Sequence, residues 1–281
     1  MRADLPPDHV TKKSVVLSIS GMEAARVHRD VPYRTDTEGT HTMDLYRPAE
    51  APPEVPLPVV VLVNGFPEPG FERVLGCKHK EMAASISWAQ LLAASGLAAI
   101  AYTNQEPVAD LAALLRALQS DASTLAIDPD RVALWACSGN GPLALSALLD
   151  RLPGIVCAAI LYGYTMDLDG GSEVADMARK VGFTNPASGR SLAELAPDLP
   201  LFLARAGQDA FPGLNVSLDR FVAHALRRNQ PLTLINHATA PHAFDLYDDG
   251  AVSHDIVRQV LAFLKLHLLA GGPAESAPQS R

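Results

Sequence analysis

Six short runs of almost entirely apolar residues recur along the chain. Runs of this length, rich in β-branched side chains and followed by Gly, Pro or Asn, are typical of strands buried on both faces of a sheet. The segments between them carry apolar residues at helical spacing. This alternation predicts an α/β fold, a mostly parallel sheet with helices on both faces, because parallel neighbours need crossover connections. The predicted strands span residues 57–63, 97–102, 131–136, 155–162, 200–206 and 231–236, and the predicted helices span residues 80–95, 108–125, 141–152, 214–228 and 253–269.

Three weaker alternating segments precede the first buried run. Residues 15–19, 27–34 and 42–47 are predicted to form antiparallel strands at one edge, which gives the sheet eight or nine strands. No linker or internal repeat divides the chain, so we expect a single domain over residues 1–269. The small, polar residues 270–281 are predicted to be a disordered tail.

One connection is much longer than the others. Residues 163–199 are polar and contain Gly170-Gly171, and residues 174–181 are predicted to form a short helix within them. A connection of this length between two strands is typical of a functional excursion. We therefore expect a short lid over a site.

Composition narrows the functional class. The chain has 281 residues, 48% of them hydrophobic, and a formal net charge of −8, which excludes a disordered chain and disfavours a nucleic-acid partner. No apolar stretch is long enough to span a membrane, and the first residues lack the pattern of a secretory signal. The three cysteines form no metal or disulfide pattern. The sequence thus predicts a soluble, cytoplasmic protein with reduced thiols.

The sharpest chemical signal is the motif Ala-Cys-Ser-Gly-Asn at residues 136–140, where a buried strand passes directly into a helix. A tight strand-to-helix turn exposes its central residue and demands small residues two places away on each side. Ala136 meets that demand, whereas Asn140 stands where Gly is usual. Ser138 is therefore a candidate nucleophile; the alternative is that it only caps the helix.

Two later loops supply partners for a serine nucleophile. Its hydroxyl needs a base to take the proton, and the base needs an acid to hold its tautomer. Asp209 follows the strand at 200–206, and His242 follows the strand at 231–236. Both are expected near Ser138, at the carboxyl edge of the sheet. Three residues stay open as alternatives: His237 as the base, and Asp167 and Asp169 as the acid.

An acyl-transfer site also needs N–H donors for the developing oxyanion. One candidate is the N–H of Gly139, directly after the nucleophile. The other is the N–H of Phe66, in the loop after the strand at 57–63, with Gly65 allowing a close approach of the backbone. The competing interpretation of this loop is a simple strand-ending turn.

These residues resemble the α/β-hydrolase superfamily, in particular its esterase and dienelactone-hydrolase-like members. The resemblance covers residues 27–268 and includes the motif Thr-Met-Asp-Leu-Tyr-Arg-Pro at 42–48. It implies an eight-stranded sheet and hydrolysis of carboxylic esters without a metal or organic cofactor. The order Ser, Asp, His also matches the family, and implies roles for Ser138 as nucleophile, Asp209 as acid and His242 as base. Asn64 and Asn140 depart from the family pattern. His or Gly is usual at the position of Asn64, and Gly is usual at the position of Asn140.

The substrate is predicted to be a short-chain or small aromatic ester. Asn64, Cys137, Tyr162 and Tyr164 are the candidate pocket residues, and Met166, Met177 and Phe183 could join them. Dienelactone hydrolases use a cysteine nucleophile, but Cys137 in that role would put Trp135 at the position that must be small. The cluster Lys78-His79-Lys80 is interpreted as a solvated face, with contact to an anionic substrate as its alternative.

Several functional alternatives remain open. The same triad could cleave a peptide, thioester or lactone or transfer an acyl group, and Asn64 and Asn140 leave room for a ligand-binding protein with a vestigial site. The expected partner is a small-molecule ester rather than nucleic acid or a membrane. A homodimer through an edge strand is also open.

Overall fold

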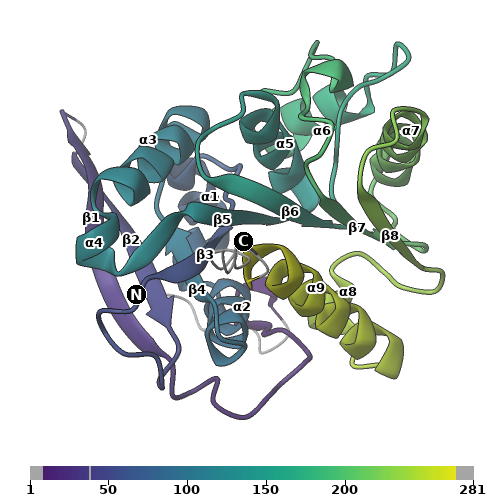
Figure 1. Cartoon of the computed structure of the whole chain (residues 1–281). Coiled ribbons are helices and arrows are strands. Elements are labelled where there is room, and N and C mark those ends of the chain that lie inside the picture. The colour runs from purple at the N-terminus through teal and green to yellow at the C-terminus, as the bar shows by residue number, and fades with distance from the viewer. Residues whose placement is uncertain (1–8, 38, 270–281) are drawn as a thin grey trace, which may run out of the picture.

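The computed structural model describes residues 9–37 and 39–269. Its centre is an eight-stranded sheet with the order β1-β2-β4-β3-β5-β6-β7-β8 (Figure 1). β1 and β2 pair antiparallel, as do β2 and β4, and all other neighbours are parallel. The predicted mostly parallel, eight-stranded sheet is therefore confirmed. The strands are β1 (Arg26–Asp36), β2 (Gly39–Arg47), β3 (Leu57–Leu62), β4 (Ala98–Tyr102), β5 (Ile127–Cys137), β6 (Ile155–Leu161), β7 (Leu201–Ala206) and β8 (Leu232–His237).

Helices cover both faces of the sheet. In Figure 1, α3, α5 and α7 lie on one face, while α2 and α9 lie on the other. Each group buries its apolar stripe in a separate core on its own side. The α-helices are α1 (Glu68–Leu75), α2 (Ala83–Ala94), α3 (Pro107–Ser120), α4 (Ala122–Leu125), α5 (Gly141–Leu149), α6 (Glu173–Val181), α7 (Leu214–Arg227), α8 (Phe244–Tyr247) and α9 (Ala251–Leu269). Four short 3-10 helices complete the described part: η1 (Val10–Lys12), η2 (His79–Glu81), η3 (Ser138–Asn140) and η4 (Leu192–Glu194).

The middle of the sheet fixes the position of the site. Residues 59–63 and 98–102 have no more than 1% of their surface exposed, because both faces of these strands are covered by helices. α5 starts at Gly141, immediately after β5 and η3, and all nine of its residues are buried. The turn between β5 and α5 is therefore held rigidly by packed elements on both sides.

The N-terminal segment was predicted wrongly. Residues 15–19 form no strand; they run irregularly across the face covered by α2 and α9. Val15 and Leu17 are buried there, and the Val15 N–H donates to Ser87 Oγ at 2.9 Å. The alternation of apolar residues thus reflects packing against helices, not pairing in the sheet.

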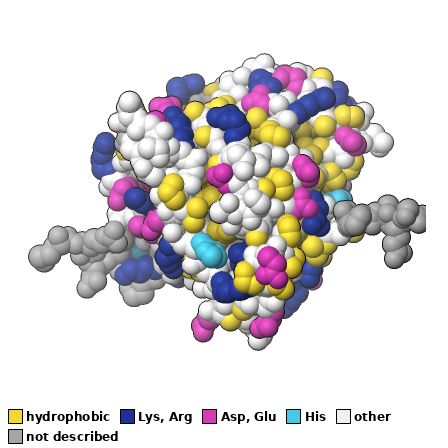
Figure 2. All heavy atoms as spheres, turned by 60° about the vertical axis from the view of Figure 1, so that its left-hand side comes forward, with side chains coloured by type: hydrophobic (Ala, Val, Ile, Leu, Met, Phe, Trp, Pro, Cys, Tyr) yellow, Lys and Arg dark blue, Asp and Glu magenta, His cyan; other side chains and the backbone are white. Residues whose placement is uncertain are grey.

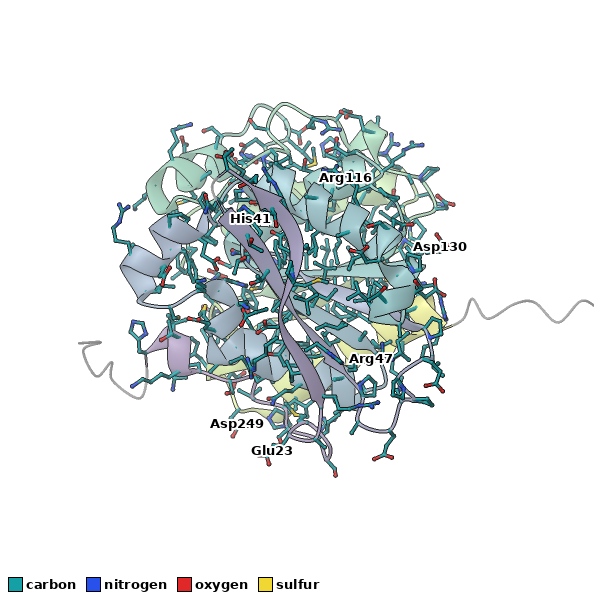
Figure 3. The ribbon with its side chains drawn as sticks, turned by 90° about the vertical axis from the view of Figure 1, so that its left-hand side faces the viewer. Glu23, His41, Arg47, Arg116, Asp130 and Asp249 are labelled. Carbon is teal, nitrogen blue, oxygen red and sulfur yellow. The ribbon has the colours of Figure 1, made fainter. Side chains whose placement is uncertain are left out.

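The antiparallel edge is tied to the parallel part by a buried arginine. Arg47, at the end of β2, donates to the carbonyl of Leu125 at 3.0 Å and to that of Ala126 at 2.5 Å, where α4 leads into β5. Figure 3 shows Arg47 and His41 at opposite ends of the same crossing pair of strands. The remainder of the charge is spread over the surface: on the face in Figure 2, Lys and Arg are interspersed with Asp and Glu. Among the helices of the described residues, none has the length and apolarity needed to cross a membrane.

Candidate active site

The turn after β5 puts Ser138 in a strained conformation. Ser138 has φ of 53°, in the left-handed region that few non-glycine residues adopt. Asn140, in contrast, has ordinary helical angles, with φ of −83° and ψ of −15°. The close backbone approach falls one residue later, because a Cβ on Gly141 would lie 2.1 Å from the carbonyl oxygen of Tyr164. Asn140 therefore has a backbone conformation that most residues can adopt, although Gly is usual at this position.

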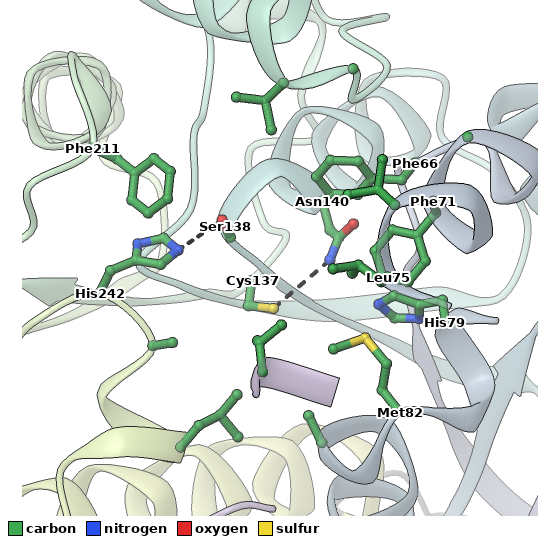
Figure 4. Close-up of a pocket in the computed structure, with 18 of the residues that line it drawn as sticks. Phe66, Phe71, Leu75, His79, Met82, Cys137, Ser138, Asn140, Phe211 and His242 are labelled. Atoms are coloured by element: carbon green, nitrogen blue, oxygen red, sulfur yellow. Dashed lines mark hydrogen bonds between the residues drawn. The ribbon is translucent and has the colours of Figure 1, made fainter. Parts of the chain in front are cut away.

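Three predicted residues meet at the carboxyl ends of β5, β7 and β8. Ser138 Oγ lies 2.9 Å from His242 Nε2, and His242 Nδ1 lies 2.6 Å from Asp209 Oδ2 (Figure 4 draws the first of these contacts). The Asp209 side chain is fully buried, and its Oδ1 accepts the N–H of Phe211 at 2.9 Å. The carboxylate thus has one oxygen for the imidazole and one anchored to the backbone.

A second layer holds the imidazole from behind. The Tyr162 ring meets the His242 ring edge to face at 4.9 Å. The Tyr162 hydroxyl donates to Asp245 Oδ1 at 2.6 Å, and Trp88 Nε1 donates to Asp245 Oδ2 at 2.7 Å. Burial raises the pKa of Asp245 and holds the pKa of Tyr162 well above its usual value. This network connects the His242 loop to β6 and α2.

The loop after β3 lies against the nucleophile turn. The Gly65 N–H donates to Asn140 Oδ1 at 2.8 Å, and a Cβ on Gly65 would lie 3.1 Å from the carbonyl oxygen of Gly139. The Phe66 N–H donates to Asn64 Oδ1 at 3.1 Å. Both residues that depart from the family pattern therefore accept hydrogen bonds from this loop.

A cavity of about 790 Å³ opens beside Ser138. Ser138 and His242 line one side of it. We call these two residues, together with Asp209, which contacts His242 Nδ1, the triad wall. The opposite side comes from the β3 loop, α1 and η2 (Figure 4). We call it the helical wall; its members are Phe66, Phe71, Leu75, His79 and Met82.

Two of the four expected pocket residues line this cavity. Cys137 and Tyr162 do so, whereas Asn64 and Tyr164 lie behind its surface. Burial raises the pKa of the Cys137 thiol to about 12, so that the thiol stays protonated near neutral pH. Tyr164 stacks on Phe183 in a small apolar cluster that also contains Met177, while Met166 belongs to the main core. From the expected lid, residues 163–199, only Val181 and Gly182 are among the described lining residues.

The reserve residues have other partners. His237 Nε2 lies 3.0 Å from Asp248 Oδ2. Asp167 accepts the backbone N–H groups of Val174 and Ala175, at the start of α6. The third, Asp169, contacts His224 Nε2 at 2.9 Å.

The basic cluster at 78–80 divides into different environments. Lys80 is buried and contacts Asp44 Oδ1 at 2.7 Å and Asp30 Oδ1 at 2.5 Å. His79 is also buried and lines the cavity, and burial lowers its pKa to about 4. The interpretation of this cluster as a solvated face was therefore wrong for both residues.

Sequence reasoning missed α1, although a signal for it exists. Pro69 lies in the first turn of the helix, and Phe71, Val74 and Leu75 follow at helical spacing. Gly76, with φ of 76°, closes it in a left-handed cap. These features define a short amphipathic helix, which brings Phe71 and Leu75 to the cavity.

No group of three or more His, Cys, Asp or Glu side chains in residues 9–37 and 39–269 is arranged to hold a metal ion. The site offers the hydrogen-bonded set Ser138, His242 and Asp209 and, as candidate donors, the N–H groups of Gly139 and Phe66. A hydrogen-bonded Ser-His-Asp set can activate a hydroxyl for attack on a carbonyl carbon.

Several solved structures with similar backbones are esterases. The Est2 esterase of Thermogutta terrifontis is 16% identical, with a TM-score of 0.63, over 91% of this chain and 96% of that chain. A thermostable esterase from Pseudomonas putida is 16% identical over 90% of this chain and 86% of that chain, with a TM-score of 0.66. A bacterial heroin esterase is 16% identical over 90% of this chain and 87% of that chain, with a TM-score of 0.63. The sequence itself matches no protein-family model and no curated protein sequence.

This chain has the α/β-hydrolase fold. In that fold the nucleophile follows a central strand, and the acid and base follow later strands in the order Ser, Asp, His. Ser138, Asp209 and His242 occupy those places, and His242 lies within hydrogen-bonding distance of both Ser138 and Asp209.

Proposed function

We propose that the protein is a serine carboxylesterase. The observation that carries the proposal is the continuous contact from Ser138 Oγ through the His242 imidazole to Asp209, at 2.9 and 2.6 Å. Two observations support an uncharged ester as substrate: there are esterases among its structural neighbours, and Arg73 is the only Lys, Arg, Asp or Glu among the described residues that line the cavity.

The reaction proceeds through an acyl-enzyme. Ser138 Oγ forms a bond to the ester carbonyl carbon while its proton passes to His242 Nε2. Asp209 holds Nδ1–H and stabilises the imidazolium. The tetrahedral adduct collapses as the bond to the alcohol oxygen breaks, and Nε2–H gives its proton to that oxygen. Water then repeats the sequence on the acyl-enzyme, with His242 as its base.

The oxyanion is held by the N–H groups of Gly139 and Phe66. The Gly65 N–H is not free for this role, because it donates to Asn140 Oδ1. Gly65 contributes instead by allowing the backbone of the β3 loop to lie close to that of Gly139. The Phe66 N–H donates to Asn64 Oδ1 at 3.1 Å, a long contact that the stronger acceptor, a developing oxyanion, shares or replaces. Small acyl groups fit beside the triad, and the helical wall extends the site for an apolar portion of the substrate.

A serine-reactive fluorophosphonate tests the nucleophile. We expect a single adduct by intact mass on the wild type, mapped to the Ser138 peptide, and none on Ser138→Ala. Hydrolysis of p-nitrophenyl acetate should fall at least about a thousandfold in this variant, because only the oxyanion donors and binding remain. Wild-type rates in Ser138→Ala would refute the proposal.

Two further outcomes separate the alternatives. Folded wild type that forms no adduct would favour a ligand-binding protein over an enzyme. If the adduct forms, product analysis with thioesters, lactones and added alcohols identifies the bond cleaved and the acyl acceptor.

A further inference from the structure

The helical wall contains a polar side chain without a polar partner. His79 is 91% buried, given its 9% exposure, and lines the same cavity as Ser138. Neither ring nitrogen makes a hydrogen bond to another of the residues 9–37 and 39–269. Nδ1 is fully enclosed, whereas Nε2 is not, so Nε2 is the ring nitrogen that a molecule in the cavity can reach. Other described side chains also carry an enclosed, unpartnered polar atom, but His79 is the one among them that lines this cavity.

The backbone fixes the direction of this imidazole. The His79 N–H donates to Glu68 Oε1 at 3.1 Å, and its carbonyl accepts the Ser85 hydroxyl at 2.7 Å. The ring leans on Phe71, with centroids 5.5 Å apart. In Figure 4 it faces the cavity from the side opposite His242, next to Met82. Its position is thus held without the use of either ring nitrogen.

Such an arrangement is unfavourable in a site that binds only apolar groups. A buried polar group that gives up water without a new partner weakens the state that contains it. A ligand that brings a hydrogen-bonding group to His79 removes this cost, and a ligand that lacks one does not.

We propose that His79 is a specificity-determining residue that binds a neutral hydroxyl group carried by the substrate, remote from the scissile ester. This inference rests on the proposed esterase function and names the substrate class: esters whose acyl or alcohol chain carries a hydroxyl. The hydroxyl both donates and accepts, so it pairs with either tautomer of a neutral imidazole.

The charges near His79 favour a neutral group over an anion. Burial lowers the pKa of His79 to about 4, so the ring is uncharged near neutral pH. Lys80 is held by Asp30 and Asp44, and Arg73 is exposed on α1. A carboxylate beside His79 would therefore lie against an uncharged ring, and Arg73, the cation among the described lining residues, is exposed to solvent.

Matched ester pairs test the inference. The acyl pair is p-nitrophenyl 6-hydroxyhexanoate and p-nitrophenyl hexanoate; the alcohol pair is 6-hydroxyhexyl acetate and hexyl acetate. The measured quantity is the ratio of kcat/KM for the hydroxylated ester to that for its partner. We expect His79→Phe to lower this ratio on the order of tenfold in one of the two pairs, because the hydroxyl loses its partner in an enclosed site.

Two variants separate a specific contact from a change of shape. His79→Gln keeps a donor and an acceptor and should retain most of the ratio. Met82→Leu changes the same wall without a polar atom and should leave the ratio unchanged. Thermal unfolding checks that each variant is folded. Equal ratios in wild type and His79→Phe for both pairs would overturn the inference.

A binding measurement keeps this inference separate from the proposed reaction. 1,8-Octanediol and 1-octanol are titrated by ligand-observed NMR into wild type and His79→Phe, and the diol should lose more affinity than the alcohol. If no ester is hydrolysed but this difference holds, the esterase proposal fails and the His79 contact stands. If p-nitrophenyl hydrogen adipate is preferred over the hydroxy ester in wild type and not in His79→Phe, the neutral class is wrong.

Discussion

The two walls of the cavity differ in how their polar groups are satisfied. On the triad wall, each side chain of Ser138, His242 and Asp209 has a partner at 2.6 to 2.9 Å. On the helical wall, the His79 ring has none among the described residues. The first wall is complete before a ligand binds, whereas the second has hydrogen-bonding capacity left for one.

The walls also differ in what supports them. The triad wall lies at the carboxyl ends of β5, β7 and β8, in a sheet that helices cover on both faces. The helical wall consists of the loop after β3, one eight-residue helix and one 3-10 turn. The proposed chemistry, which needs sub-ångström positioning, thus lies on the rigid part, and the proposed ligand selection lies on the part that can vary without disturbing it.

The largest effect is expected from a break in the triad wall. Asp209→Asn keeps the size of the side chain but can donate to His242 Nδ1, which then holds the wrong tautomer. We expect kcat for p-nitrophenyl acetate to fall by about 10³ to 10⁴, with little change in thermal unfolding.

The matched control for this variant is Asp169→Asn. Asp169 is exposed, contacts His224, and follows the neighbouring strand β6. It should keep the wild-type kcat. A loss in Asp169→Asn equal to that in Asp209→Asn would contradict the assignment of the acid.

In α1, the helix that carries Phe71 and Leu75 of the helical wall, the largest expected effect is on stability. Burial of Glu68 raises its pKa to about 7 from 4.5, so the folded protein holds a proton that the unfolded chain releases. The free energy of unfolding therefore falls as the pH rises from 4.5 to 7, by on the order of 3 kcal/mol, and is flat above. Glu68→Gln keeps the acceptor for the His79 N–H but cannot ionise, and should remove this dependence.

Urea unfolding of wild type and Glu68→Gln between pH 4.5 and 8 measures the effect. The variant should gain stability relative to wild type as the pH rises. Glu72→Gln removes an exposed carboxyl from the same helix, and its free energy of unfolding should change with pH as that of wild type does. If the free energy of unfolding of Glu68→Gln changes with pH as that of wild type does, Glu68 ionises as freely in the folded protein as in the unfolded chain, and the prediction is wrong.

Local sequence predicted the triad wall because its determinants are local. A buried strand, a tight turn and a chain order fixed Ser138, Asp209 and His242 at one edge of the sheet before any contact was known. The strain at Ser138 was expected as well, but its neighbour Asn140 proved to have ordinary angles.

The helical wall could not be predicted in the same way. Pro69 and Gly70 obscure a short helix, and the burial of His79 depends on where α1 and η2 pack. That packing involves contacts distant in sequence, such as Lys80 of η2 with Asp44 of β2. Packing between segments distant in sequence also explains the wrong prediction of a strand at residues 15–19. The alternating apolar residues there pack against helices and pair with no strand.

The smallest expected effect lies where the two walls meet. Asn140 Oδ1 accepts the Gly65 N–H at 2.8 Å, and so connects the turn that carries Ser138 to the loop that carries the Phe66 N–H. Loss of this contact leaves both elements in place but loosens the spacing between nucleophile and oxyanion donor. Asn140→Ala should therefore lower kcat about tenfold, with KM nearly unchanged, because the contact matters most in the transition state.

Cys137→Ala is the control that decides the cause. Asn140 Nδ2 also donates to Cys137 Sγ, at 3.8 Å, so a loss in Asn140→Ala could arise through either neighbour. If the connection to Gly65 is responsible, Cys137→Ala keeps a kcat close to that of wild type, and the double variant is no slower than Asn140→Ala alone. If Cys137→Ala reproduces the whole loss, the two walls are positioned independently, and the departure from glycine at residue 140 serves the pocket rather than the oxyanion loop.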